Sequence, residues 1–156
     1  MQLELHRPSE NSPVRISRRD FRIMSFLRRN AIDLEPVKSS RIASAIAIKG
    51  NIVSLGYCSK RTHPFQKRFA KNPDAIYLHA ETNAIRNSLN HMPPADLQQA
   101  TLYINRQKPP PHDTKAWVDG LAKPCAGCER AIIEFGLKRV VYTTEITNEY
   151  EVLTAK

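Results

Sequence analysis

Two short segments of the chain carry side chains of the types that can hold metal ions and move protons. One reads HAE at residues 79–81, within the stretch YLHAETNAI, and the other reads PCAGC at residues 124–128. The two cysteines are three residues apart, so on a helix they share one face, and the helix dipole in the first turn favours thiolates. Because zinc binds thiolates and imidazoles, His79, Cys125 and Cys128 are candidate zinc ligands.

Three protein ligands are typical of a catalytic zinc site, which keeps a fourth position for water, whereas structural zinc sites use four. Glu81 lies two residues after His79. Residues two apart do not face each other on a regular helix, so both side chains line one pocket only if the motif spans the start of the helix. A carboxylate beside the activated water can take its proton and pass it on, which makes Glu81 the candidate catalytic residue.

Two other interpretations of these segments stay open. A CxxC near a strand–helix–strand pattern also fits a thiol redox pair, although that interpretation leaves the HAE segment unexplained. A zinc-stabilised binding module would need a fourth protein ligand, and the remaining candidates lack the spacing of a zinc motif. Those candidates are His63, His91, His112 and Cys58.

The elements that must position these residues follow from hydrophobic periodicity and turn residues. Ser17 can cap a helix that runs to about Asn30, in which Phe21, Met24 and Leu27 recur at helical spacing. We expect these three apolar side chains to face the core.

A hairpin and the first motif follow. Strands are expected at 42–48 and 52–57, around a turn at 49–51 that contains glycine. Residues 58–76 are expected to form a long basic loop, and a loop of that length is usually functional or disordered. The HAE segment then opens a helix over 79–90.

The second motif sits in a strand–helix–strand unit. A strand at 100–105 leads into a proline-rich loop over 106–123, followed by a helix over 124–135 that begins with its proline and ends at Gly136. A buried strand follows at 137–144. Such a unit implies a parallel strand pair, and a mixed sheet between helices fits the whole order of elements.

Length and composition bound the remaining possibilities. The 156 residues fit one domain, which we expect to span 15–145, between an irregular segment at 1–14 and a C-terminal tail at 146–156. No apolar run approaches the roughly 20 residues of a membrane helix, and the N-terminus has no signal-peptide core, so we expect a cytoplasmic protein with no membrane partner. Three cysteines are too few for a disulfide scaffold.

The net charge of +9 suggests an anionic partner. Residues 60–71 carry five basic side chains and no acidic one, and this stretch leads into the HAE segment. Lys60 and Arg61 are therefore candidate contacts for a substrate phosphate. Residues 15–29 add six arginines against one aspartate, Asp20. Either cluster could also be an ordinary solvated surface.

At these residues the chain resembles the zinc-dependent cytidine and deoxycytidylate deaminase superfamily, whose signature is H-x-E followed by P-C-x-x-C. The likeness extends from about residue 44 to 142, and the stretches HAETNAI and CERAIIEFGLKRVVY look most like deoxycytidylate deaminases and their phage-type relatives. The resemblance implies a three-layer α/β/α fold with a mixed five-stranded sheet. It also implies zinc held by His79, Cys125 and Cys128, with Glu81 as proton shuttle.

The resemblance implies further roles at the site. The backbone N–H of Ala80 would contact the base, and Asn83 matches the asparagine of HAExN and would support the site. The implied reaction is hydrolytic deamination of a cytosine-type deoxynucleotide, dCMP to dUMP or a 5-modified analogue. The alternative is a deaminase acting on a base in single-stranded DNA or tRNA. Relatives are usually oligomeric, so a homo-oligomer is expected, in the host cytoplasm if the chain is phage-encoded.

The chain departs from the deoxycytidylate subfamily in one place. After the second strand that subfamily usually shows G-Y-N-G, whereas residues 56–59 read GYCS. The sugar recognition and nucleotide allostery of that subfamily are therefore not implied for this chain.

Overall fold

The strands of this protein form one mixed sheet. Their order is β1-β7-β6-β4-β2-β3, and β5 pairs with β4. The computed structural model describes residues 5–6, 16–34, 41–58, 64–69, 79–110 and 116–155. The strands are β1 (Leu5–His6), β2 (Arg41–Ile48), β3 (Asn51–Tyr57), β4 (Thr101–Lys108), β5 (Val118–Gly120), β6 (Arg139–Thr143) and β7 (Tyr150–Ala155). Five of these strands have five or more residues, and the two shorter strands, β1 and β5, extend the sheet that the other five form.

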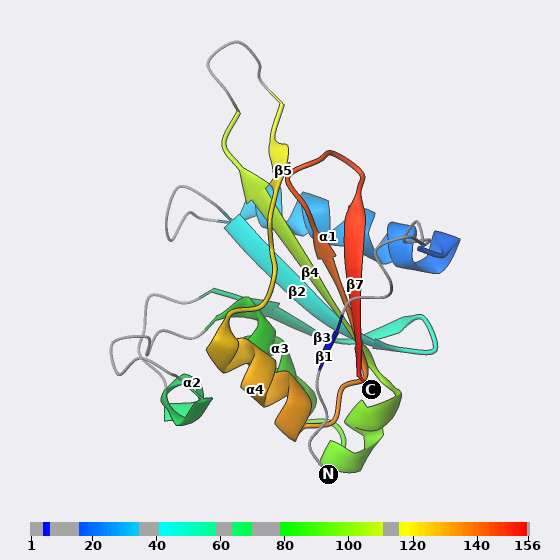
Figure 1. Ribbon diagram of the computed structural model, residues 1–156, viewed down its shortest axis with the longest axis vertical. Coiled ribbons are helices and arrows are strands. Elements are labelled where there is room, and N and C mark those ends of the chain that lie inside the picture. Colours follow the sequence, from blue (N-terminus) through cyan, green and yellow to red (C-terminus); the bar gives the residue numbers. More distant parts are fainter. Residues whose placement is uncertain are drawn as a thin grey trace.

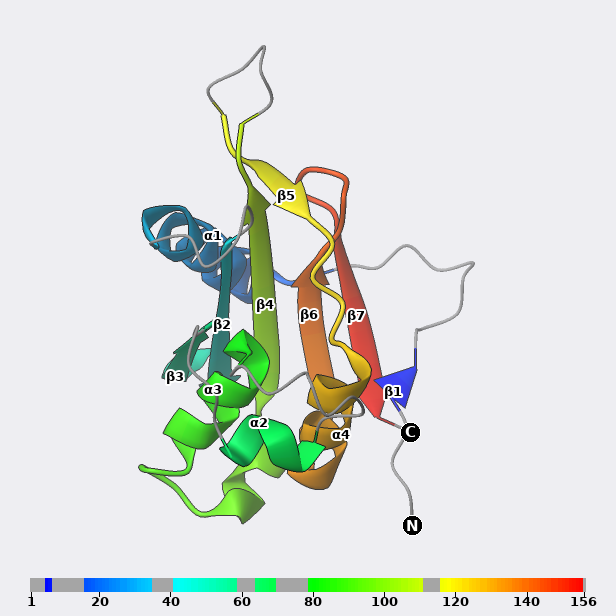
Figure 2. The ribbon, with the colours of Figure 1, turned by 90° about the vertical axis from the view of Figure 1, so that its left-hand side faces the viewer.

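Helices cover both faces of the sheet. Helix α1 (Arg18–Asp33) packs on one face, and α3 (Ala80–Ser88) and α4 (Ala126–Glu134) pack on the other. The short helix α2 (Pro64–Phe69) lies against α4, and Figure 2 shows α2, α3 and α4 together across the lower half of the sheet. A 3-10 helix, η1 (Pro94–Gln99), precedes β4. The predicted three-layer α/β/α fold with a mixed sheet is thus confirmed.

Strand β2 shows how one strand serves both layers. Successive side chains of a strand point to opposite faces, and Ala43, Ala45 and Ala47 belong to the core under α1. The alternate residue Ile46 belongs to the core under α3 and α4, and Ser44 bonds to α3. Three small side chains on one face allow α1 to lie close to the sheet.

The expected parallel pair is present around α4. Strands β4 and β6 pair in parallel, in a register that runs from Thr101 opposite Arg139 to Ile104 opposite Tyr142. Helix α4 connects them, and Gly136 adopts a φ of +78° directly after it. This left-handed conformation suits glycine and ends the helix, as predicted.

Helix α1 is fixed to the sheet by a buried carboxylate. Ser17 caps the helix as predicted, because its hydroxyl accepts from the Asp20 N–H while the Asp20 carboxylate accepts from the Ser17 N–H, both at 3.0 Å. Arg139 donates two hydrogen bonds to Asp20, at 2.8 and 2.7 Å, and the Tyr103 hydroxyl donates a third at 2.5 Å. Burial alone would raise the pKa of Asp20, but the hydrogen bonds from Arg139 and then Tyr103 hold it below its ordinary value.

The expectation for the apolar stripe of α1 is partly wrong. Met24 and Leu27 are fully buried, but Phe21 is 47% exposed and only its edge contacts the ring of Tyr150. Asp20 and Ile23 take the inward positions instead. The helix also runs three residues further than expected, to Asp33.

Two segments expected to be loops contain regular structure. Within the basic segment 58–76, residues 64–69 form α2, because Phe65 and Phe69 pack against Phe135, the C-cap residue of α4, with ring centroids 5.8 and 6.1 Å apart. Within 106–123, β4 continues to Lys108 and β5 pairs with it.

The end of the chain is part of the sheet. Residues 150–155, which the sequence analysis assigned to a C-terminal tail, form β7, and β7 pairs with β6 and β1. The proposed division into one domain with terminal segments stays a prediction. In the described part of the chain, no helix is long and apolar enough to cross a membrane.

Candidate metal centre

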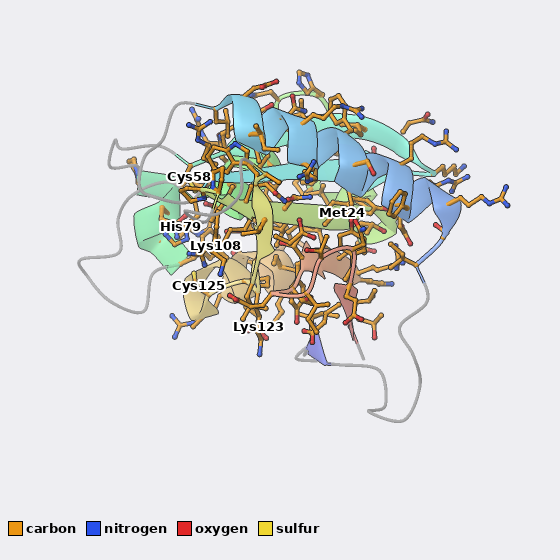
Figure 3. The ribbon with its side chains drawn as sticks, turned by 90° about the horizontal axis from the view of Figure 1, so that it is seen from above. Met24, Cys58, His79, Lys108, Lys123 and Cys125 are labelled. Atoms are coloured by element: carbon orange, nitrogen blue, oxygen red, sulfur yellow. The ribbon has the colours of Figure 1, made fainter. Side chains whose placement is uncertain are left out.

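The two predicted motifs meet at the N-termini of α3 and α4. His79 is the N-cap residue of α3 and Cys125 is the N-cap residue of α4, and both have extended backbone conformations. His79 Nδ1 lies 3.2 Å from Cys128 Sγ and 3.5 Å from Cys125 Sγ. Figure 3 shows His79 and Cys125 on the α4 side of the sheet, across from Met24 under α1. His79 and Cys125 are 46 positions apart in the sequence, and the fold brings two sulfurs and one imidazole nitrogen together.

The donor set fits zinc in type and spacing. Zinc bound tetrahedrally at about 2.3 Å from sulfur and about 2.1 Å from nitrogen would hold these ligands about 3.6 Å apart. The sulfur–nitrogen distances found are close to that value, and the three donor atoms lie within 4.8 Å of one another. Among the described residues, Cys58 and His91 do not join this group. His63 and His112 lie outside the described residues.

The two thiols differ in their affinity for protons. Hydrogen bonds from the Cys128 side chain and then from His79 outweigh the effect of burial and lower the pKa of Cys125 to about 3. The same contact and burial raise the pKa of Cys128 well above its usual range. Without metal, the exposed Cys125 is thus the thiolate and the buried Cys128 keeps its proton. A metal ion that replaces this proton would bind two thiolates at once.

Glu81 lies in contact with the ligand set. Glu81 is 7% exposed as a whole residue, and its Oε2 accepts from the Cys128 thiol at 2.9 Å. Burial raises the pKa of Glu81 above its ordinary value. His79 precedes the first turn of α3 and Glu81 lies within it, so the two side chains reach one site although they are two residues apart. A buried carboxyl group with raised proton affinity suits a proton carrier.

Four side chains fix α3 to the hairpin beneath it. Ser44 and Ser54 donate to the carbonyl groups of Ala80 and Ala84, at 2.5 and 2.6 Å. From the helix, Asn83 donates to the Tyr57 carbonyl and Asn87 to the Leu55 carbonyl, at 3.0 and 2.9 Å. The two asparagines are four residues apart, which is about 6 Å along a helix, and the two carbonyl groups are two residues apart, which is about 6.7 Å along a strand. Because these spacings are similar, each amide can bond to one carbonyl group. Asn83, predicted to support the site, thus has a contact that ties α3 to the end of β3.

A glycine allows this close packing. A Cβ atom on Gly56 of β3 would lie 2.8 Å from Ala84 Cα and closer still to the Ala80 carbonyl oxygen and the Ala84 nitrogen. All three are backbone atoms, which cannot move independently of the helix. Glycine at this position therefore sets how near the first turn of α3 comes to the sheet.

Gln66 is a residue that sequence reasoning missed. It lies on α2, is 1% exposed, and its Oε1 accepts from the His79 N–H at 3.2 Å and from the Thr82 hydroxyl. The His79 side chain makes no capping hydrogen bond to α3, so Gln66 supplies an acceptor at the helix start while the imidazole turns to the sulfurs. Its only sequence signal is an uncharged polar residue within a basic segment.

The segment that leads to Cys125 is tied to the ends of β4 and β6. The Ala122 N–H donates to the Thr143 carbonyl at 3.0 Å, and Arg106 donates to the Leu121 carbonyl at 3.2 Å. Pro124 precedes the cap rather than starting the helix as predicted, because the Cys125 sulfur itself accepts from the Cys128 N–H. Sequence reasoning did not identify Arg106 as a residue that positions this approach.

Of the remaining predicted substrate contacts, only Ala80 lies in the described part of the chain. Lys60 and Arg61 lie outside the described residues. Ala80 is the first residue of α3, so its N–H has no acceptor within the helix, and its side chain is fully buried.

Comparison with known proteins agrees with this geometry. The model of the cytidine and deoxycytidylate deaminase zinc-binding region matches residues 18–144, which include both motifs, all three donor residues and Glu81. No curated protein sequence matches the chain. The match covers most of the 156 residues, and zinc is the metal that suits the three donors. The chain therefore belongs to the cytidine and deoxycytidylate deaminase family of zinc-binding domains.

Proposed function

We propose that this protein hydrolytically deaminates a cytosine-type deoxynucleotide, dCMP to dUMP or a 5-modified analogue. The family supports zinc-dependent cytidine or deoxycytidylate deamination in general. The observation that carries the proposal is the contact between the Glu81 carboxyl group and the Cys128 sulfur of the three-donor group. This contact places an acid–base group beside three metal-binding side chains, a number that leaves a fourth position on zinc for water.

His79, Cys125 and Cys128 would hold the zinc ion. Bound zinc supplies a Lewis acid that makes water acidic enough to lose a proton near neutral pH. Glu81 accepts that proton and delivers it to N3 of the base, while the water oxygen forms a bond to C4. Glu81 then takes the remaining proton from the hydroxyl group now on C4 and delivers it to the amino group, so that the C4–N4 bond breaks, a C4 carbonyl forms, and ammonia leaves with a uracil-type product.

Substrate contacts can be assigned to named residues. The Ala80 N–H, which has no acceptor in α3, would donate to the base. Asn83 would act indirectly, because its amide holds the end of β3 beside the site. Lys60 and Arg61 would contact the phosphate of a nucleotide. The expected homo-oligomeric state and cytoplasmic location remain predictions.

A deamination screen tests the proposal. The zinc-loaded protein would be given cytidine, deoxycytidine, their mono- and triphosphates, and 5-modified forms, with ammonia release as the readout. We expect the fastest release from dCMP or a 5-modified dCMP. In Glu81→Gln, which preserves shape but removes the acid–base group, we expect zinc to be retained and the rate to fall about 10²- to 10⁴-fold.

Glu149→Gln is the matched control, because Glu149 is exposed in the turn before β7 and remote from the donor group. Its rate should equal that of the unmodified protein. Full activity in zinc-loaded Glu81→Gln would contradict the proposed mechanism. Activity on nucleosides alone would contradict the nucleotide assignment while leaving the mechanism intact.

A further inference from the structure

Three arginines form a ridge along the outer face of α1. Arg18, Arg22 and Arg29 are exposed and lie opposite the buried stripe of the helix, which includes Met24 and Leu27. Four residues of helix advance about 6 Å and seven about 10 Å, so the three guanidinium groups can follow one extended partner. Within the described residues, no ion pair or side-chain hydrogen bond engages any of the three. We call this set the arginine ridge.

The acidic residue nearest the ridge in sequence does not neutralise it. Asp20 is buried on the inner side of α1, where Arg139 of β6 binds it through both carboxylate oxygens. Of the two acidic residues in α1, only Asp33 at the C-terminal end is exposed. The outer surface of α1 is therefore more positive than its sequence suggests.

Exposed aromatic rings flank the ridge. Phe21 is 47% exposed and Phe26 is 36% exposed, and both lie among the arginines in the sequence RRDFRIMSFLRR. The other basic stretch of the chain is different, because Phe65 and Phe69 turn inward and pack on Phe135. Arginines interleaved with accessible rings occur on surfaces that bind single strands, where the cations hold phosphates and the rings stack on bases.

We propose that the outer face of α1 binds single-stranded nucleic acid through its phosphate backbone, with bases stacked on Phe26 and Phe21. This face lies across the sheet from the donor group, as Figure 3 shows for α1 and Cys125. Binding there is independent of the deamination chemistry and of whether the bound strand contains cytosine. The site adds a second, electrostatic function to the fold.

The test uses a fluorescent oligo(dT) strand, which has no base that the proposed reaction could deaminate. Its affinity for the zinc-loaded protein is measured by fluorescence anisotropy over a range of salt concentrations. The ridge variant combines Arg18→Gln, Arg22→Gln and Arg29→Gln. We expect its affinity to fall at least about tenfold and the slope of log affinity against log salt to decrease by about 2, since each phosphate contact on a single strand contributes about 0.7.

A control variant removes equal charge elsewhere. Arg86 of α3, Arg130 of α4 and Lys138, just before β6, are exposed and lie outside α1, and replacing all three by Gln should leave oligo(dT) binding within about twofold. Phe26→Ala should weaken binding about tenfold with no change in the salt slope, because stacking releases no counterions. Equal melting temperatures would confirm that each variant is folded.

Three results would overturn the proposal. One is equal loss of binding in the control and ridge variants, which would indicate general attraction to a basic protein. Another is tighter binding to duplex DNA than to oligo(dT), which would remove the role of the rings. The third is displacement of oligo(dT) by a polyglutamate peptide of equal charge, which would indicate an acidic protein partner. Deamination of free nucleotide is measured separately and should be unchanged in the ridge variant.

Discussion

The packing of α3 over Gly56 makes a quantitative prediction about the metal site. In Gly56→Ala, the new Cβ atom would lie 2.8 Å from Ala84 Cα, where ordinary contact needs 3.4 Å or more. The helix must therefore recede from β3 by at least about 0.6 Å, because the contacts with the Ala80 carbonyl oxygen and the Ala84 nitrogen are closer still. His79 and Glu81 belong to the start of this helix and would move with it, whereas Cys125 would not.

A shift of this size exceeds what a metal site tolerates. Metal–ligand distances in a sound site stay within about 0.2 Å of their usual values, so the imidazole can no longer meet both sulfurs. We expect zinc affinity to fall at least tenfold and the deamination rate to fall tenfold to hundredfold. Overpacking should also cost about 1–3 kcal/mol of folding stability.

The assay pairs zinc competition against a chromogenic chelator with ammonia release at saturating zinc, and thermal unfolding reports the fold. Gly120→Ala is the matched control, because the atoms nearest its Cβ belong to side chains, those of Lys108 at 3.0 Å and Arg106 at 3.2 Å, and not to the backbone of a helix. Its zinc affinity should change far less than that of Gly56→Ala. A folded Gly56→Ala protein with unaltered zinc affinity and rate would refute the argument that Gly56 sets the position of α3.

Three further perturbations have defined outcomes. Gln66→Leu removes the acceptor of the His79 N–H, so stability should fall by about 1–3 kcal/mol in urea denaturation and zinc should bind several-fold more weakly. Asp20→Asn breaks a buried pair with Arg139 and should cost about 3 kcal/mol. Because the folded-state pKa of Asp20 is lowered, the stabilisation is complete above about pH 5 and is lost progressively as the pH falls below that. The difference in unfolding free energy between the two proteins should therefore shrink in acid, and an unchanged difference at pH 3 would contradict a stabilising pair of Asp20 with Arg139. After zinc is removed with a chelator, the Cys125 thiolate should be alkylated before the buried Cys128, and mass spectrometry of the peptides would show which cysteine reacts first. Alkylation of Cys128 before Cys125 would contradict an ionised Cys125 thiol.

The features that were predictable from sequence have local causes. The start of α1 follows from the Ser17 and Asp20 capping box, which needs only residues three apart. The turn between β2 and β3 follows from Gly50, which adopts a φ of +80°. The donor group was predictable because both motifs sit at helix starts, so each segment fixes its own ligands once the two helices are brought together.

The features that were missed depend on contacts between distant segments. Helix α2 has six residues and owes its place to the rings of Phe65 and Phe69 on Phe135, about seventy residues away, which no local pattern shows. Strand β5 has three residues and exists only through its pairing with β4. The capping role of Gln66 likewise arises only when α2 meets α3.

The two asparagines of α3 have a consequence for contact between molecules. Strand β3 is the last strand in the described order of the sheet, and such a strand can recruit a strand of another chain through its unpaired backbone groups. Asn83 and Asn87 already occupy the carbonyls of Tyr57 and Leu55. An incoming strand would have to displace both amides. These hydrogen bonds therefore protect the β3 edge of the sheet from aggregation by strand addition.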